Sequence, residues 1–361
     1  MSAISARRRS TRGSTVGILA NPASGRDIRR LVARGTVFPL AEKCSIIARL
    51  LSALGATGVE RVLLLPDRGG IAERMRRIVA TQSPQEHWPE VEFLDMTIED
   101  GPLDTVRGAE MMSAAGVGAI VVLGGDGTHR LAASACSRIP LMALSTGTNN
   151  VFPELREPTV AGLATGLVAT DQVSPAEATV RNKVLRLEAN GAPQDLAVVD
   201  IAVSDHCWVG SKALWRPDTL DQIFVAFAEP DAIGLSSIAG LLRPVSRRAA
   251  YGLRVDLGPP ERAAFTLLCP VAPGLMSPVG IEGSREIQVG EVQNLRLTRG
   301  VIALDGEREW TFTPDQQIAI RLDDQGPFTI DVDYVMARAA QEGLLIVDSP
   351  VGEALGGKSW N

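Results

Sequence analysis

The stretch from Ala119 to Asn150 constrains the fold of this chain more than any other. It opens with Ala119–Leu123, a short apolar run rich in β-branched residues, which is typical of a strand buried on both faces of a parallel sheet. The strand ends in the loop GGDGT, where three glycines allow close backbone approach and let N–H groups converge on an anion. Thr128 is expected to cap the helix that follows, whose free N–H groups favour phosphate.

A second apolar run, Ile139–Leu144, ends in another small, hydroxyl-rich loop, Ser145–Asn150. Two strand-to-loop junctions this close predict that both loops lie at the same carboxyl edge of one sheet, where open α/β sheets bind their ligands. Asp126 is the only carboxylate in either loop. Among phosphate-binding amides, such a carboxylate either holds a cation or takes a proton from an attacking hydroxyl.

Two other nucleotide-binding motifs do not explain this stretch. The dinucleotide pattern G-x-G-x-x-G would need a glycine where Arg130 stands. A Walker pattern occurs at Gly352–Ser359, but only Trp360 and Asn361 follow it. We therefore expect no helix there to present its N-terminus to a phosphate, and we interpret that match as accidental.

The first half of the chain alternates strands and helices. Thr15–Ala20 predicts a first strand, followed by the turn Asn21–Gly25, in which asparagine and serine can donate or accept hydrogen bonds. Apolar residues recur at steps of three and four over Leu40–Leu54, which predicts an amphipathic helix that packs in the core. Residues 14–155 are therefore expected to form a Rossmann-like, three-layer α/β domain with a mostly parallel sheet.

Beyond Pro153 the pattern changes to short alternating strands. This predicts an all-β, sandwich-like domain over residues 156–335. Asn190-Gly191 is a strong hairpin signal, and Asp305-Gly306 between strands is another candidate turn.

Two more segments complete this outline. Ile233–Val245 predicts a short helix that packs on the sandwich, with contact to a membrane surface as the alternative. A final helix and a strand at Leu345–Val347 are expected, and residues 336–361 are assigned to a C-terminal segment.

Composition limits the partners of the chain. Its formal net charge is −6, and aromatic residues make up 4% of it, so it lacks the basic field and the stacking surfaces that nucleic acid binding needs. No apolar run reaches the length that spans a bilayer. We therefore expect no nucleic acid partner, no stable membrane insertion and a cytoplasmic location.

GGDGT after a buried strand, followed by a G-T-N-N loop, resembles the superfamily of NAD kinases and diacylglycerol- or sphingosine-type lipid kinases. STGTNN followed by Val151-Phe152-Pro153 is most similar to the ATP-NAD kinase-like proteins called acetoin catabolism protein X. The resemblance implies the two-domain NAD kinase/diacylglycerol kinase-like fold, with a C-terminal segment that returns to the first domain. It is also compatible with a homo-oligomer.

The resemblance further implies a set of site residues. ATP and Mg²⁺ would lie on three loops, whose candidate residues are Asn21, Ser24, Gly25, Gly124, Gly125, Gly127, Thr128, Thr146, Gly147, Thr148, Asn149 and Asn150. The segment Leu304–Glu307 matches the L-D-G-E element of the lipid kinases, in which the glutamate is a candidate base. Asp126, Glu307 and Asp305 are therefore the candidate catalytic residues.

The chain also departs from the NAD kinase pattern. NAD kinases carry an Asn-Glu pair early in the second domain, and the nearest counterpart here is Val199-Asp200, which leaves Asp200 as the candidate substrate contact. Their S-P-T-G-S-T-A-Y segment is missing. ATP binding is therefore better supported than NAD as the acceptor.

Three functions remain open at this point. The leading one is an ATP-dependent kinase, a phosphotransferase acting on a hydroxyl of NAD or a related nucleotide in the cleft between the domains. The second is a lipid kinase that acts on a diacylglycerol or sphingoid hydroxyl. The third is a nucleotide-binding regulator of a catabolic pathway that carries out no reaction.

Overall fold

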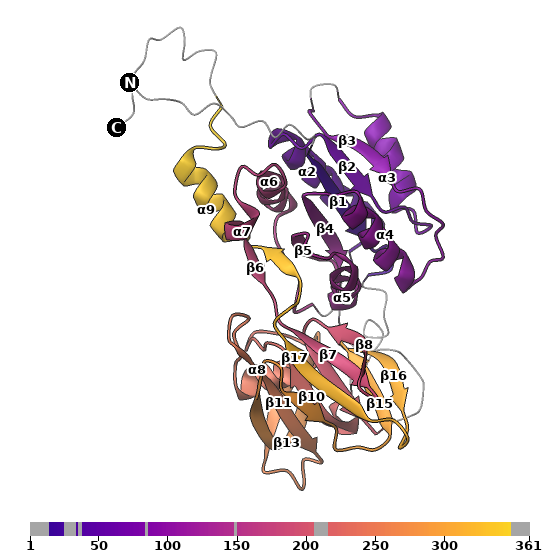
Figure 1. The fold of residues 1–361 in the computed structure, drawn as a ribbon, viewed down its shortest axis with the longest axis vertical. Coiled ribbons are helices and arrows are strands. Elements are labelled where there is room, and N and C mark those ends of the chain that lie inside the picture. Colours follow the sequence, from indigo (N-terminus) through magenta and orange to yellow (C-terminus); the bar gives the residue numbers. More distant parts are fainter. Residues whose placement is uncertain are drawn as a thin grey trace.

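The computed structural model describes residues 14–24, 34, 38–83, 86–147, 150–205 and 216–347. They form an α/β domain and an all-β domain, which lie one above the other in Figure 1. This architecture confirms the fold class predicted from the sequence.

The first domain is built on a seven-stranded sheet in the order β3-β2-β1-β4-β5-β18-β6. Its strands are β1 (Thr15–Ala20), β2 (Arg61–Leu64), β3 (Glu90–Phe93), β4 (Ala119–Gly124), β5 (Leu141–Ser145), β18 (Phe328–Ile330) and β6 (Thr179–Arg181). Strands β1 to β5 are parallel. The chain runs outward from β1 to β3 and then returns to place β4 on the other side of β1, so the strand order reverses between β1 and β4. Open α/β sheets bind ligands at such a reversal.

Helices cover both faces of this sheet. They are α2 (Leu40–Ala56), α3 (Ile71–Ala80), α4 (Pro102–Ala114), α5 (Asp126–Ala135), α6 (Pro158–Ala169), α7 (Pro175–Ala178) and α9 (Val332–Glu342). Side chains of α2, α3, α6 and α9 form one apolar core with alternate residues of the strands, and those of α4 and α5 form a second core. β1 and β4 are buried along their whole length because both faces are covered.

The second domain contains two antiparallel sheets. The larger has the order β12-β13-β11-β10-β9-β15-β16 and the smaller the order β14-β17-β7-β8. The strands are β7 (Val184–Ala189), β8 (Ala192–Ala197), β9 (Asp200–Ser204), β10 (Leu220–Val225), β11 (Tyr251–Gly258), β12 (Phe265–Ala272), β13 (Leu275–Gln288), β14 (Val292–Asn294), β15 (Gly300–Leu304), β16 (Glu307–Phe312) and β17 (Ile318–Asp323). The 3₁₀ helix η1 (Pro217–Thr219) precedes β10.

Both predicted hairpin turns form. Asn190 and Gly191 have φ values of 53° and 77° and connect β7 to β8, and Asp305 and Gly306 have φ values of 50° and 80° and connect β15 to β16. Two positive φ values in succession fit a type I′ turn, which suits the right-handed twist of paired strands. The second of these turns places Glu307 at the start of β16.

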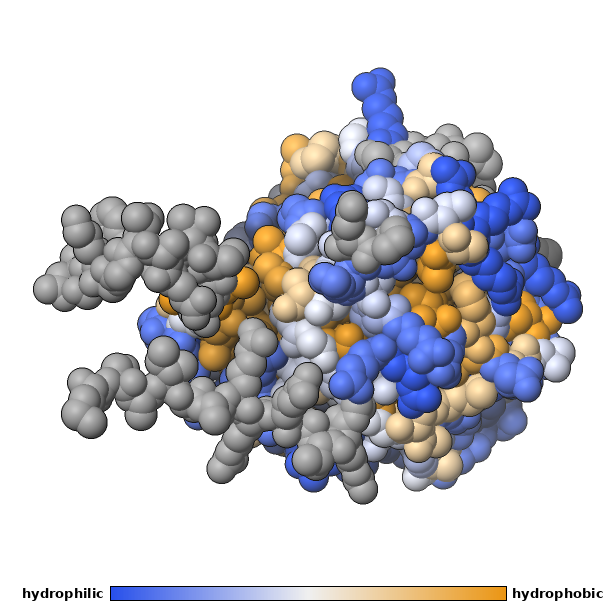
Figure 2. All heavy atoms as spheres, turned by 90° about the horizontal axis from the view of Figure 1, so that it is seen from above, coloured by the Kyte–Doolittle hydropathy of each residue, from blue (hydrophilic) through white to orange (hydrophobic). Residues whose placement is uncertain are grey.

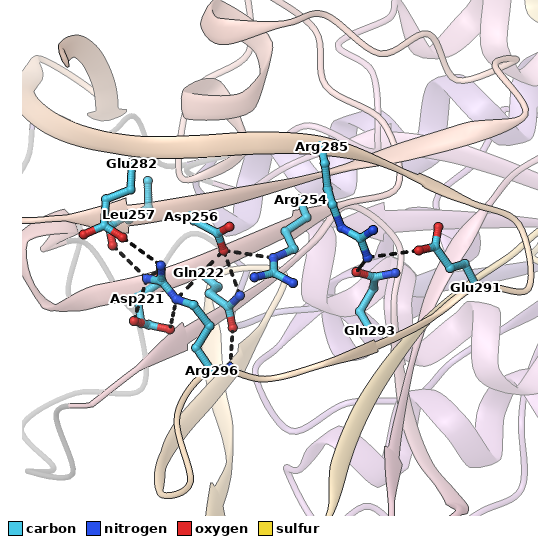
Figure 3. A network of polar contacts seen from close by, with 10 residues as sticks. All are labelled: Asp221, Gln222, Arg254, Asp256, Leu257, Glu282, Arg285, Glu291, Gln293 and Arg296. Atoms are coloured by element: carbon cyan, nitrogen blue, oxygen red, sulfur yellow. Dashed lines mark hydrogen bonds and ion pairs between the residues drawn. The ribbon is translucent and has the colours of Figure 1, made fainter. Parts of the chain in front are cut away.

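An apolar core fills the space between the two sheets, and a second core lies under α8 (Ser236–Leu242) on the outer face of the larger sheet. Elsewhere a polar network joins β10, β11 and β13 to β14 and the segment that follows it (Figure 3). Gln222 lies fully buried in this network and binds Asp256 through its amide nitrogen and the backbone N–H of Arg296 through its oxygen. The network therefore satisfies both polar atoms of the buried Gln222 side chain.

The burial of α8 and its flanks distinguishes the two predictions for Ile233–Val245, packing on the sandwich and contact with a membrane surface. Ile238 and Val245 are completely buried and Leu235 is nearly so, while Leu241 is 39% exposed. The segment therefore packs on the sandwich, as the sequence favoured. Among the described residues, no helix is both long and apolar enough to cross a membrane. Seen from above the first domain, hydrophilic and hydrophobic areas alternate over the surface (Figure 2).

The second domain is inserted into the first. The chain leaves the first sheet after β6 and returns to it at β18, which pairs with both β5 and β6. This division differs from the expected second domain at 156–335, because α6, α7 and β6 at its start and β18 and α9 at its end pack with the first domain. The true boundaries follow from the pairing of β18 with β5 and β6, and local sequence patterns do not reveal a pairing between such distant segments.

Two local predictions are wrong. Helix α5 begins at Asp126 after Gly125, so Thr128 lies inside its first turn and does not cap it. Leu345–Val347 is not a strand, because Gly343 adopts a left-handed conformation that ends α9 and the exposed residues after it pair with no strand among the described residues.

Substituting Gly162 tests the close packing of α6 on α2. A Cβ atom at this position would lie 2.7 Å from the Cβ of Ala53 and 3.1 Å from the carbonyl oxygen of Leu50. We expect Gly162→Ala to lower the free energy of unfolding by roughly 1–3 kcal/mol, because the backbone contact cannot relax easily, although alanine favours helix. Chemical denaturation measures this change.

Gly101→Ala is the matched control for that variant. Nothing lies within 4 Å of a Cβ atom at Gly101, and its φ of −129° suits any residue. An equal loss of stability in both variants, or a gain for Gly162→Ala, would contradict the close packing.

Candidate active site

A pocket of about 540 Å³ lies between the two domains, at the carboxyl ends of β1, β2 and β4. It opens where the strand order reverses, and both domains line it. The first domain contributes residues from the loops after β1, β2, β3, β4 and β5, and the second contributes Asp305 and Glu307. Inter-domain crevices of this kind are common ligand sites.

Three of the predicted loops are tied together at the floor of this pocket. The side-chain amide of Asn21 donates to the hydroxyl of Thr128 over 2.9 Å, which joins the loop after β1 to helix α5. The hydroxyl of Ser24 lies 3.0 Å from that of Thr146, which joins the same loop to the end of β5. The structure therefore brings these four candidate residues together.

The glycines of GGDGT serve mainly to let the loops pack closely. A Cβ atom at Gly124 would lie 2.6 Å from the hydroxyl of Thr128, and one at Gly125 would lie 2.9 Å from the side-chain oxygen of Asn150. A Cβ atom at Gly147 would lie 2.8 Å from the Cα of Gly125. Gly127 differs, because the nearest atoms to its Cβ position are those of the Glu307 carboxylate, 3.6 Å away.

Asp126 uses its carboxylate to hold the backbone after β5. Its Oδ1 accepts hydrogen bonds from the N–H of Val151 at 3.0 Å and of Phe152 at 2.8 Å. The side chain is 7% exposed and lies at the N-terminus of α5, where partial positive charge stabilises it. Asp126 therefore fixes the course of the loop that follows Asn150.

Asp305 has the same role in the second domain. Its carboxylate accepts hydrogen bonds from the N–H groups of Val198 at 3.0 Å, Val199 at 2.7 Å and Asp200 at 3.2 Å. Burial, together with the nearby carboxylates of Asp200 and Asp126, raises the pKa of Asp305 well above its ordinary value. Asp305 thus fixes the turn between β8 and β9.

Glu307 is placed differently from these two aspartates. It follows the β15–β16 turn and reaches from the second domain to the first turn of α5, where its carboxylate lies over Gly127. Its backbone pairs with Leu304, but its carboxylate makes no hydrogen bond or ion pair in the described parts of the chain. Its carboxylate is therefore available to a ligand in the pocket.

The remaining candidates are less central. Asp200 is on β9, 5% exposed and beside Asp305, and it is not among the described residues that line the pocket. Gly25, Thr148 and Asn149 lie outside the described residues.

Three residues that sequence reasoning missed also shape the site. Lys43 of α2 is buried under the loop after β1 and donates to its carbonyls. Arg130 of α5 is 4% exposed and forms an ion pair of 2.6 Å with Asp195 of β8, which links the two domains. Arg247 of the second domain donates to the carbonyl oxygens of Val151 and Phe152, whose N–H groups bind Asp126.

Only Lys43 left a signal in the sequence. It stands three, four and seven residues before Ile46, Ile47 and Leu50, and so shares their apolar stripe. A charged residue in such a stripe indicates a buried role. Arg130 and Arg247 have partners far away in the chain, which no local pattern reveals.

These features define a protein with an α/β domain, an inserted all-β domain and a pocket between them. A family model described as ATP-NAD kinase N-terminal domain matches residues 16–173, and one described as acetoin catabolism protein X C-terminal domain matches residues 183–325. The chain is 47% identical over 335 residues to acetoin catabolism protein X of Cupriavidus necator, covering 91% of this chain and 93% of that protein. The chain therefore belongs to the acetoin catabolism protein X family.

A solved structure, that of an NAD kinase from Archaeoglobus fulgidus in complex with ATP, is more distantly similar. It shares 14% sequence identity with a TM-score of 0.37, and the match covers 80% of this chain and all of that one. The two family models and the Cupriavidus relative establish the family without it.

His129 provides a test of the burial of α5. Its ring is completely buried near Phe152, and its Nδ1 donates to the carbonyl oxygen of Gly125 over 2.8 Å. Burial lowers the pKa of His129 to about 4. Between about pH 6.5 and 4, His129 is therefore protonated in the unfolded chain but not in the folded chain. The free energy of unfolding falls as the pH is lowered through this window.

We expect His129→Asn to make the free energy of unfolding less dependent on pH, while the asparagine amide still offers a donor near the carbonyl oxygen of Gly125. The wild-type protein should lose about 3 kcal/mol at most from this residue between pH 7 and pH 4. The raised pKa of Asp305 acts in the opposite direction, because its ionisation destabilises the fold as the pH rises. The measurement is therefore the difference in slope between variant and wild type in denaturation at several pH values, and equal slopes would rule out a buried neutral His129.

Proposed function

We propose that this protein transfers the terminal phosphoryl group of ATP to a hydroxyl group of NAD or a related nucleotide in the cleft between its domains. One observation carries the proposal. Glu307 reaches from the second domain to the N-terminus of α5, where the phosphate-binding loops meet, and its carboxylate makes no bond within the described structure. That is the position a general base needs in order to act on an acceptor beside bound phosphates.

The pocket has room and chemistry for the donor nucleotide. At about 540 Å³ it falls in the range of small-molecule sites. Part of its wall is apolar and suits a nucleoside, with side chains from Ala20, Leu65, Pro66, Ile98, Pro102 and Leu131. The phosphates would then lie towards Asn21, Gly127 and Thr128, at the first turn of α5, where helix N–H groups favour negative charge.

The three candidate carboxylates divide into two roles. Asp126 accepts hydrogen bonds from two backbone N–H groups and Asp305 from three. If either carboxylate turned towards a substrate to accept its proton, it would lose these bonds and release a loop. Glu307 has no such task. In the proposed step, the bond between the terminal phosphorus and the bridging oxygen of ATP breaks, the acceptor oxygen bonds to that phosphorus, Glu307 takes the hydroxyl proton, and ADP leaves.

Magnesium fits this pocket as a partner of the nucleotide. Within the described chain, no three His, Cys, Asp or Glu side chains are grouped to hold a metal by themselves. Mg²⁺ bound to nucleotides usually takes few protein ligands and several phosphate oxygens and waters. When bound, it would neutralise charge on the transferred group. Asp126 belongs to the first turn of α5, and the carboxylate of Glu307 lies over Gly127 of the same turn.

Two findings bear on the choice of acceptor. Most apolar residues of α8 and its flanks pack inside the second domain, which favours the packing role of this segment over contact with a membrane. The relative from Cupriavidus necator is named for acetoin catabolism, which supports a role in a catabolic pathway. A soluble nucleotide acceptor therefore has more support than a lipid.

The test is an assay of ADP release with ATP and Mg²⁺ against NAD, NADH, a panel of nucleosides and a short-chain diacylglycerol. NAD or another nucleotide should give ADP together with its phosphorylated product. Turnover with the diacylglycerol alone would show that the protein is a lipid kinase. ATP binding with no turnover of any acceptor would indicate a regulator.

Glu307→Gln tests the assigned base directly. We expect turnover to fall roughly a hundred- to ten-thousand-fold, because the amide cannot accept the proton. Calorimetric ATP binding should be unchanged or tighter, because a negative charge near the phosphates is lost. Glu261→Gln, at an exposed position in the second domain, is the control and should behave like the wild type. Full turnover in Glu307→Gln would exclude this residue as the base.

A further inference from the structure

Lys43 of α2 is an ammonium group held inside the first domain. Its side chain is 1% exposed, and its Nζ donates to the carbonyl oxygens of Asn21 at 2.9 Å, Pro22 at 3.2 Å and Ser24 at 3.1 Å. It also donates to the hydroxyl of Ser24 at 2.8 Å. One cation therefore gathers the loop that follows β1.

The direction of these bonds matters for the pocket. Carbonyl oxygens carry partial negative charge and would repel a phosphate group. In this loop three of them point at the ammonium of Lys43, although the loop residues themselves line the pocket. Lys43 thus turns the negative ends of the loop away from the ligand.

The same cation acts on the other loops through Ser24. The hydroxyl of Ser24 lies between Lys43 and the hydroxyl of Thr146, and Asn21, whose carbonyl binds Lys43, donates its amide to Thr128. The loops after β1 and β5 and the first turn of α5 therefore share one polar network, which contains Lys43. Such a network fixes the relative positions of its members.

The charges around the pocket make this cation important. Among the described residues that line it are six carboxylates, those of Asp67, Asp100, Asp104, Asp126, Asp305 and Glu307, and two cations, Arg68 and Arg130. Arg130 is already paired with Asp195 and Arg68 with Asp100. A polyphosphate entering this pocket meets an acidic lining, so a buried positive charge beneath the loop adds to the field that favours it.

We propose that Lys43 is the positioning residue of the phosphate end of this pocket, and that it sets the affinity for the triphosphate of a nucleoside triphosphate without touching it. The proposal rests on the proposed use of ATP. It does not depend on which hydroxyl group accepts the phosphoryl group.

A buried lysine could instead serve only the stability of the fold, and the chain contains a suitable comparison. Lys183 in the second domain is also buried, at 6% exposure, and its Nζ donates to the carbonyl oxygens of Ser246 at 3.3 Å and Tyr251 at 2.6 Å. It is not among the described residues that line the pocket. Lys183→Met is therefore a matched control for Lys43→Met.

The experiment compares three ligands by calorimetry on the full-length chain: ATP with Mg²⁺, tripolyphosphate with Mg²⁺, and adenosine. Lys43→Met should weaken ATP and tripolyphosphate about tenfold or more, because the loop loses the cation that holds its carbonyl oxygens away from the phosphates, and leave adenosine within about twofold. Lys183→Met should lower the melting temperature but bind all three ligands as the wild type does. Ser24→Ala, which keeps the ammonium and removes one of its acceptors, should weaken ATP by a smaller factor.

Several outcomes would overturn the proposal. One is a folded Lys43→Met protein that binds ATP as the wild type does, and another is an equal loss for adenosine, which would mean a purely structural role. If Lys43→Met does not fold, Ser24→Ala decides, and unchanged ATP affinity in that variant refutes the proposal. A wild-type protein that binds neither ATP nor tripolyphosphate also refutes it, whereas one that binds ATP and phosphorylates nothing refutes only the kinase activity.

Discussion

The cleft depends on two buried carboxylates that bind backbone N–H groups. Asp126 holds the residues after β5 and Asp305 holds the turn between β8 and β9, so each domain uses one aspartate to fix one wall of the cleft. A buried N–H group without a partner is costly, and these bonds remove that cost at several positions at once. The same bonds occupy both side chains, whereas the carboxylate of Glu307, which also lines the pocket, makes no such bond in the described parts of the chain.

The walls are joined to each other as well as fixed. Arg247 binds the carbonyl oxygens of the two residues whose N–H groups bind Asp126, and its guanidinium also pairs with Glu229 and lies over the ring of Phe227. The peptide groups after β5 are therefore held from one side by the first domain and from the other by the second. Together with the ion pair of Arg130 and Asp195, this makes the position of the pocket loops depend on how the two domains are oriented.

Much of the fold follows from local patterns in the sequence. The strands before GGDGT and N-P-A-S-G, and the hairpin turn at Asn190-Gly191, were predicted correctly because short apolar runs and turn residues specify them within a few positions. The insertion of the second domain could not be predicted, because β18 pairs with β5 across almost 190 residues of chain. Likewise, GGDGT and Leu304–Glu307 marked Asp126 and Glu307 as candidates, but no sequence pattern showed that Asp126 binds backbone N–H groups whereas the carboxylate of Glu307 does not.

The way the second domain is inserted has an evolutionary consequence. Phe328 pairs with Arg181, so the chain leaves the first domain and re-enters it at one point. An inserted unit whose two ends are neighbours can be exchanged for another without disturbing the host. The pocket belongs mostly to the host, and Asp305 and Glu307 belong to the insert. Exchange of the insert is therefore a simple route by which one α/β domain could acquire different residues on the second wall of its pocket.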